Sequence, residues 1–85
     1  MDYTITELYI NDEALFSLPP DISRYTNLKY LNCDNNNITC LDNLPQTLKK
    51  LLFDITSLIH HPKNFNIGRY DNYNENLYSL EYIQP

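Results

Sequence analysis

The sequence contains a single glycine among its 85 residues, and this scarcity excludes one common kind of site. Phosphate-binding loops depend on several closely spaced glycines, so we expect no nucleotide-binding loop of that type. No apolar run approaches the roughly 20 residues of a membrane-spanning helix, and no basic stretch followed by an apolar run opens the chain. We therefore predict no membrane partner, no signal peptide and a cytoplasmic location.

Positive charge is also scarce. Six lysines and arginines face 11 aspartates and glutamates, which gives a net charge of −5. Binding to a phosphate backbone needs clustered basic residues, so nucleic acid is not an expected partner. The negative balance suits a soluble surface or a basic partner. A chain of 85 residues makes one small domain with a limited core.

Residues with catalytic or metal-binding chemistry are few. The two cysteines, Cys33 and Cys40, are not spaced as a zinc pair and have no second pair. Without an export signal, both are expected to be free thiols in a reducing compartment. His60 and His61 are adjacent, so in an extended chain they point to opposite sides and do not converge on a metal. With no spacing typical of a catalytic triad, we predict no enzyme activity, no metal and no cofactor.

What the sequence has instead is a repeated frame of apolar residues. Residues 28–41, LKYLNCDNNNITCL, are apolar at positions 1, 4, 6, 11 and 14 and have asparagine at position 9. The same spacing starts at residues 5 and 48, and a truncated unit starts at residue 77. In the three full units 14 of 15 frame positions are apolar, whereas only four of the 18 positions 2, 3, 5, 7, 8 and 9 are. The frame residues are Ile5, Leu8, Ile10, Leu15 and Leu18; Leu28, Leu31, Cys33, Ile38 and Leu41; Leu48, Leu51, Phe53, Leu58 and His61; and Leu77, Leu80 and Tyr82.

The alternation of positions 4 and 6 with positions 3, 5 and 7 is typical of a strand with one apolar face. One unit cannot bury that face alone, so parallel stacking of the units is expected to form a curved solenoid. The residues at position 9, Glu13, Asn36 and Thr56, are expected to turn inward and bond the bending backbone. We also expect Cys33 in the core, Cys40 on a flank, and His61 against the core.

The chain resembles the leucine-rich repeat family over nearly its whole length. Residues 18–28, LPPDISRYTNL, resemble its typical unit, and residues 41–48, LDNLPQTL, resemble its short unit of about 20 residues. That short unit is familiar from bacterial effectors and giant DNA viruses, which would place the protein in host cytoplasm. The resemblance implies one leucine-rich repeat domain over residues 1–85, a right-handed superhelix of the α/β class dominated by strand and coil. A short parallel sheet would form its concave face and irregular or 3₁₀ segments its convex side, with short helical turns in the longer units.

The sequence departs from this family pattern at both ends. No N-terminal cap is recognisable, so the first strand would leave an open edge, and uncapped edge strands would allow a homo-oligomer. Residues 63–76 form a polar insertion that we interpret as a loop on the flank.

Stacking aligns equal positions of the units, so the exposed strand positions form columns across the concave face. In these columns Ser79 is expected beside Lys50, Glu81 beside Leu52 and Ile83 beside Asp54. This face would combine an aromatic and aliphatic middle with an acidic column, and tyrosine is enriched where proteins bind proteins. The predicted partner-binding residues are Glu7, Tyr9, Tyr30, Asn32, Asp34, Lys50, Leu52 and Asp54.

Three functions are compatible with this pattern. The first is a non-catalytic module that binds a partner protein through the concave face. The second is a structural fragment that assembles through its edge strands. The third is the substrate-recognition arm of a larger enzyme such as a ubiquitin ligase.

Overall fold

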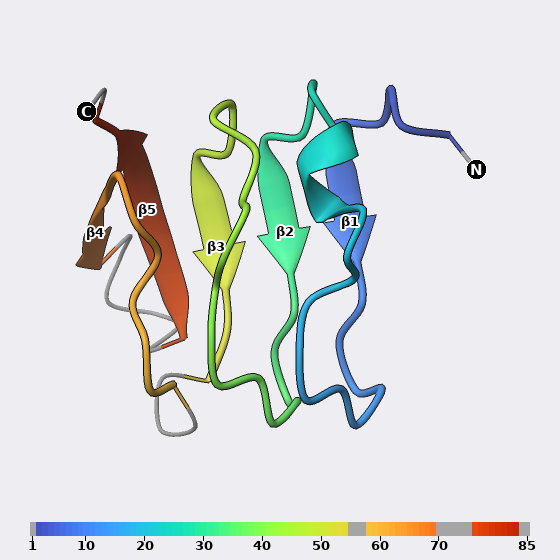
Figure 1. Cartoon of the computed structure of the whole chain (residues 1–85), viewed down its shortest axis with the longest axis vertical. Coiled ribbons are helices and arrows are strands. Elements are labelled where there is room, and N and C mark those ends of the chain that lie inside the picture. Colours follow the sequence, from blue (N-terminus) through green and yellow to red (C-terminus); the bar gives the residue numbers. More distant parts are fainter. Residues whose placement is uncertain (1, 55–57, 70–75, 84–85) are drawn as a thin grey trace.

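The computed structural model describes residues 2–54, 58–69 and 76–83, and these are almost entirely strand and loop (Figure 1). The described residues form no α-helix, and their one helical turn is of the 3₁₀ type. The elements in chain order are β1 (Glu7–Tyr9), η1 (Ile22–Arg24), β2 (Tyr30–Asn32), β3 (Lys50–Leu52), β4 (Phe65–Arg69) and β5 (Leu77–Tyr82). The five strands form one sheet in the order β1-β2-β3-β5-β4. The predicted dominance of strand and coil is confirmed.

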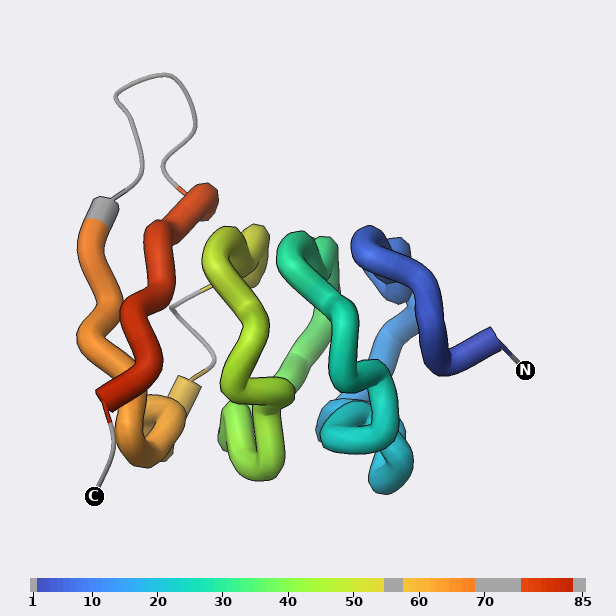
Figure 2. The backbone as a smooth tube through the Cα atoms, turned by 90° about the horizontal axis from the view of Figure 1, so that it is seen from above, coloured from blue at the N-terminus to red at the C-terminus, as the bar shows by residue number. Residues whose placement is uncertain are grey.

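The first three strands run parallel to one another, with the register that the repeated frame predicts. Figure 2 shows the successive turns of the chain side by side, from the N-terminal end in blue to the C-terminal strands in orange and red. The rows of Cα partners across the strands are Glu7–Tyr30–Lys50, Leu8–Leu31–Leu51 and Tyr9–Asn32–Leu52. Equal positions of the first three units therefore lie next to each other, as expected.

The C-terminal part of the sheet corrects the prediction of a purely parallel sheet. Strand β5 runs antiparallel to β3, and β4 runs antiparallel to β5, so the sheet is mixed. Lys50 still lies opposite Ser79, but Leu52 lies opposite Leu77 and not opposite Glu81. Reversing a strand about one pair exchanges its ends, and Ser79 and Leu80 keep their expected faces because the side-chain period is two. The expectation for Leu77 was wrong: this frame residue lies beside outer-face Leu52 and is half-buried, whereas Tyr78, outside the frame, is buried in the core.

Part of the expected flank loop is also a strand. Residues 65–69 form β4 at the edge of the sheet, with Phe65 and Ile67 packed against the core and Asn66 exposed. The rings of Phe65 and Tyr82 meet edge to face at 5.4 Å, and the Ile83 amide donates to the Asn64 carbonyl at 2.7 Å. The alternation in FNIGR is thus a genuine strand signal, and the loop prediction was wrong there. Residues 70–75 of the insertion lie outside the described residues.

The core lies on one side of the sheet, beneath the loops that return from each strand to the next. Frame residues of the second and third units are its centre, and their counterparts in the first unit, Ile5, Leu8, Ile10 and Leu15, are only half-buried against it. The predicted core position of Cys33 is confirmed, and Cys40 is partly exposed as expected. The buried apolar residues are Leu18, Ile22, Tyr25, Leu28, Leu31, Cys33, Ile38, Leu41, Leu44, Leu48, Leu51, Phe53, Tyr78 and Leu80.

The prediction for His61 was wrong. His61 is exposed, and the next residue, Pro62, is buried in its place. The apolar proline ring has no hydrogen-bond donor to satisfy, whereas burial of an imidazole without partners costs free energy.

Asn36 is the buried polar residue around which the chain turns after β2. Its Oδ1 accepts hydrogen bonds from the backbone amides of Glu13, at 3.1 Å, and Leu15, at 2.9 Å. Its Nδ2 donates to the carbonyls of Ile10, at 2.9 Å, and Cys33, at 3.0 Å. This one side chain therefore joins the turn after β1 to the turn after β2, as expected for an inward asparagine at position 9.

The other two residues at position 9 do not extend this row. Glu13 is exposed, so the prediction that it turns inward was wrong, and its backbone amide is served by Asn36 instead. Thr56 lies outside the described residues. Asn35 takes a left-handed backbone conformation, with φ of 54°, which asparagine tolerates better than most residues.

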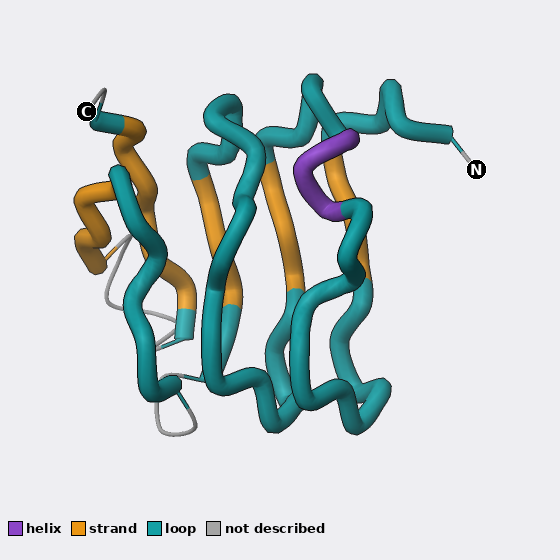
Figure 3. The backbone as a smooth tube through the Cα atoms, viewed as in Figure 1, coloured by secondary structure: helices purple, strands orange, loops and turns teal. Residues whose placement is uncertain are grey.

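The connection from β1 to β2 contains the helical turn that its length allows. This turn, η1, is the purple segment in Figure 3. The Tyr25 amide donates to the Ile22 carbonyl at 3.3 Å, and the side chains of both residues are buried. The shorter connection before β3 has no helical turn, in agreement with the expectation for a 20-residue unit. Buried Pro45 lies in that connection, where it removes a backbone donor.

Candidate partner-binding face

Six of the predicted binding residues lie together on the side of the sheet that faces away from the core. Leu8, Leu31 and Leu51, at the middle of the three parallel strands, point toward the core, so the residues on either side of them point the opposite way. We call this side the outer face, and in β1, β2 and β3 it consists of Glu7, Tyr9, Tyr30, Asn32, Lys50 and Leu52.

Two tyrosines on neighbouring strands form the aromatic part of the outer face. The ring centroids of Tyr9 and Tyr30 are 5.6 Å apart, and the ring planes are tilted by 55°. The Tyr9 side chain is 58% exposed, and its hydroxyl donates to Glu7 Oε1 at 2.7 Å. That hydrogen bond raises the pKa of Tyr9, and burial raises the pKa of Tyr30. Both hydroxyls are therefore protonated at neutral pH. The Tyr30 hydroxyl can donate to a partner, whereas the Tyr9 hydroxyl already donates to Glu7 and can only accept from a partner.

The two predicted aspartates follow β2 and β3 at one end of the outer face. Asp34 is half-buried, its backbone amide donates to Asn32 Oδ1 at 3.1 Å, and its Oδ1 accepts from Asn76 Nδ2 at 3.2 Å. Asp54, also half-buried, lines a shallow depression of about 320 Å³ together with Asp12. This end of the face is therefore acidic, and the Asp34 carboxylate there already accepts a hydrogen bond from within the chain.

Asp12 remains ionised at this acidic end. Hydrogen bonds from the side-chain amides of Asn35 and then Asn11 hold the pKa of its carboxyl below the ordinary value. Charge-assisted hydrogen bonds favour the ionised form, so the carboxylate keeps its negative charge at neutral pH.

Residues of β5 continue the outer face beyond β3, and the sequence placed only part of them correctly. Ser79 lies opposite Lys50 as expected, but Leu77, not Glu81, lies beside Leu52. Ile83 was expected beside Asp54, whereas Asn76 bonds Asp34 in that region. The face therefore gains the Leu52–Leu77 pair, which nothing in the repeated frame could reveal, because the frame fixes spacing and not strand direction.

Strand β4 adds a flat margin to this face. Gly68, opposite Ser79, has no side chain, and Ser79 Oγ donates to the Gly68 carbonyl at 3.2 Å. A Cβ atom at residue 68 would lie 3.2 Å from that hydroxyl oxygen, so glycine allows the close approach.

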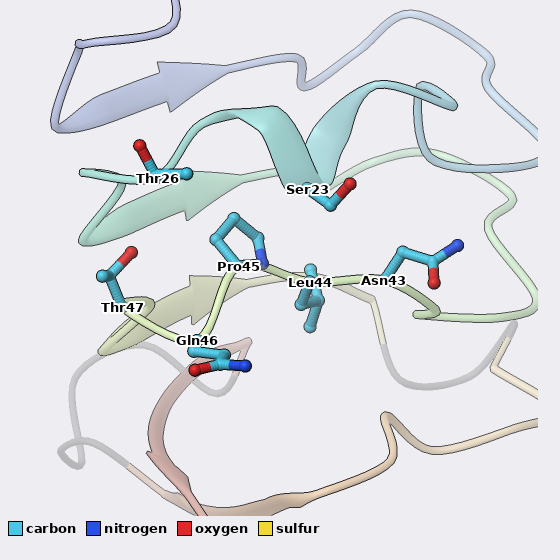
Figure 4. A pocket seen from close by; sticks show the side chains of 7 residues that line it. All are labelled: Ser23, Thr26, Asn43, Leu44, Pro45, Gln46 and Thr47. Carbon is cyan, nitrogen blue, oxygen red and sulfur yellow. The ribbon is translucent and has the colours of Figure 1, made fainter.

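A pocket of about 340 Å³ lies away from the outer face, between the connections that precede β2 and β3 (Figure 4). Leu44 and Pro45 form its apolar floor, and none of its lining residues carries a charge. Thr47, at its margin, uses its hydroxyl to donate to the Leu28 carbonyl at 2.8 Å. The pocket is thus a gap between two connections, lined by hydroxyl, amide and apolar side chains and by no carboxylate, imidazole, thiol or amine.

The cysteines do not form a reactive site. Burial raises the pKa of the Cys33 thiol to about 12, so it stays protonated in the core. A hydrogen bond to Asp42 raises the pKa of Cys40, which lines a depression together with His60 and His61. Among the described residues, no three metal-ligating side chains are grouped as a metal site would require.

Comparisons with known proteins give no relative for this chain. No family model, no curated protein and no solved structure matches it significantly. Across residues 2–54, 58–69 and 76–83, no helix is both long and apolar enough to cross a membrane. The resemblance to leucine-rich repeats therefore rests on the repeated frame of the sequence alone.

Proposed function

We propose that this chain is a non-catalytic protein-interaction module that binds a partner protein through its outer face. The fold we propose for it is a short leucine-rich repeat solenoid, in which β1, β2 and β3 are the strands of successive coils and the outer face is the concave side. The cytoplasm is the compartment that suits its two free thiols.

The observation that carries the proposal is the aromatic and aliphatic strip across the outer face. Tyr9 and Tyr30 are in ring contact on β1 and β2, and the Leu52–Leu77 pair follows on β3 and β5. None of these four side chains is fully buried. Aromatic side chains at the centre of an interface bring large contact area at a low entropic cost, and they dominate binding energy when a partner excludes water from them.

Polar groups around the strip supply the features of an interface rim. Glu7 and Lys50 flank Tyr30 on either side, and Asp34 and Asp54 lie at one end. Charges at a rim contribute more to specificity and association rate than to affinity. A partner that fits this face would present an apolar or aromatic centre with basic residues toward the acidic end.

The test is quantitative capture of partners from the source cell by the wild-type chain and by two double variants. Tyr30→Ala with Leu52→Ala removes the centre of the strip, and Phe16→Ala with Ile59→Ala removes two side chains that are 73% and 70% exposed on the connecting loops. We expect the first pair to lose the captured partner, and the second pair to retain it. Circular dichroism establishes that each variant is folded at the temperature of capture. Equal retention by both pairs would refute the outer-face assignment.

A further inference from the structure

The net negative charge of the molecule lies on the N-terminal segment, which forms one edge of the sheet. Residues 1–23 contain five carboxylates, Asp2, Glu7, Asp12, Glu13 and Asp21, and no lysine or arginine, whereas the remaining 62 residues carry six charges of each sign. The next basic residue, Arg24, lies with its guanidinium 4.6 Å from the centroid of the Tyr3 ring and offsets one of these negative charges. The whole net charge of −5 therefore lies on the segment that contains β1.

Strand β1 is also an edge of the sheet, with one side of its backbone directed outward (Figure 1). The Thr6 carbonyl accepts from the amides of Lys29 and Tyr30, and the Ile10 amide donates to the Asn32 carbonyl at 2.8 Å. Backbone groups of alternate residues point to opposite sides of a strand. The amides and carbonyls of Glu7 and Tyr9 therefore point away from β2, in the direction where a further strand would pair.

The core is incompletely covered at this same edge. Ile5, Leu8, Ile10 and Leu15 of the first unit are half-buried. The residues at the same positions of the second unit, Leu28, Leu31, Cys33 and Ile38, are between 0% and 5% exposed. The difference arises because β2 has a neighbour on each side and β1 has only one. An added strand would bury the apolar row of β1 as β1 buries that of β2.

We propose that the β1 edge is a second docking site, which takes an extended basic segment of a partner protein as an additional strand. The alternation of β1 fixes the chemistry of that segment. On the outer face its side chains would lie beside Glu7, so we expect these side chains to be basic. Its alternate side chains would cover Leu8 on the core side, so we expect these to be apolar. A second copy that pairs through its own β1 fits less well, because it would bring a further five negative charges to the same edge. Pairing of β1 with the β4 edge of a second copy is the alternative that sedimentation detects.

Synthetic peptides of seven residues that alternate valine with lysine test this proposal by fluorescence anisotropy. We expect the lysine peptide to bind, with about 10-fold weaker binding when salt is raised from 50 to 500 mM, and the matching valine–glutamate peptide not to bind. Glu7→Gln, which keeps an acceptor for the Tyr9 hydroxyl, should weaken binding about 3-fold, since exposed charge pairs contribute under about 1 kcal/mol. Glu81→Gln, an exposed carboxylate on β5, is the matched control and should leave affinity unchanged.

Two methylated lysine peptides test whether the backbone pairs. One carries N-methyl groups on its lysines and the other on its valines. An antiparallel added strand presents the lysine amides to β1, and a parallel one presents the valine amides, so methylation should abolish binding in one peptide and spare it in the other. Binding of both methylated peptides, or of neither, would overturn the proposal. Dimer formation in sedimentation, together with no binding of the lysine peptide, would also overturn it. The outer-face double variant, Tyr30→Ala with Leu52→Ala, should still bind the peptide, so this test is independent of the proposed function.

Discussion

The parallel part of the sheet and its C-terminal hairpin differ in the direction in which neighbouring strands pair. In the parallel part, β1, β2 and β3 are joined by long connections that return beneath the sheet, and every strand enters in the same direction. In the hairpin, β4 and β5 pair antiparallel, and β5 reverses direction against β3. Both parts nevertheless place alternate side chains on the same outer face. The faces of Ser79 and Leu80 are thus unchanged by strand direction, whereas the face of Leu77 and the cross-strand neighbour of Leu52 are changed.

Truncation of the central leucine of the parallel part should give the largest effect. Leu31 is fully buried between β1 and β3, so Leu31→Ala is expected to lower the free energy of unfolding by about 3 kcal/mol. Urea denaturation followed by circular dichroism measures the change. A loss under about 1 kcal/mol would show that this part of the core is not packed as described.

Removal of the buried asparagine side chain should come next. Asn36→Ala leaves the Glu13 and Leu15 amides and the Ile10 carbonyl without their partner, and we expect a loss of about 2 kcal/mol in the free energy of unfolding. The exposed neighbour Asn37 offers a matched control, and Asn37→Ala should change stability by less than about 0.5 kcal/mol. Similar losses for the two variants would contradict the role assigned to Asn36.

The buried thiol of the parallel part should make stability depend on pH. The pKa of Cys33 is about 12 in the folded chain against an ordinary value of 9.0, so the unfolded chain loses this proton first as pH rises. The contribution of the buried Cys33 thiol to the free energy of unfolding is complete below pH 9. It is lost at higher pH, by at most about 1.4 kcal/mol per pH unit. Urea titrations from pH 8 to 10 measure the slope. Cys33→Ala should flatten the slope more than Cys40→Ala does, because the pKa of Cys40 is also raised but by less; an unchanged slope in Cys33→Ala would contradict the assignment.

The smallest effect is expected at the outer strand of the hairpin. Ile67 of β4 is half-buried against the core, so Ile67→Ala should lower the free energy of unfolding by about 1 kcal/mol, measured as for Leu31→Ala. A loss as large as that for Leu31→Ala would mean that the hairpin is as central to the fold as the parallel part.

The repeated frame predicted most of the parallel part because each frame residue there has a single physical requirement, burial. It gave the strand register, the place of Cys33 and the inward turn of Asn36. It failed where two signals compete. The polar composition of residues 63–76 predicted a loop, although the short alternation in FNIGR predicted the strand that forms there. The spacing of the frame predicted burial of His61, although the adjacent apolar Pro62 is the residue that is buried.

The candidate face was predictable for the same reason and to the same extent. The outward direction of the Tyr9, Tyr30 and Leu52 side chains follows from alternation along the strands alone. The pairing of Leu52 with Leu77 across the strands and the hydrogen bond from Asn76 to Asp34 depend on the reversal of β5, which is set by tertiary packing of residues far apart in the sequence.

Photo-crosslinking in the source cell tests the central claim, that the outer face binds a protein, most directly. Benzoylphenylalanine replaces Tyr30 on the outer face in one sample and Phe16, an exposed aromatic residue on a connecting loop, in another. We predict that the probe at residue 30 joins the chain covalently to a defined partner protein and that the probe at residue 16 does not. Crosslinks to the same partner from residue 16 alone, or equally from both positions, would contradict the claim.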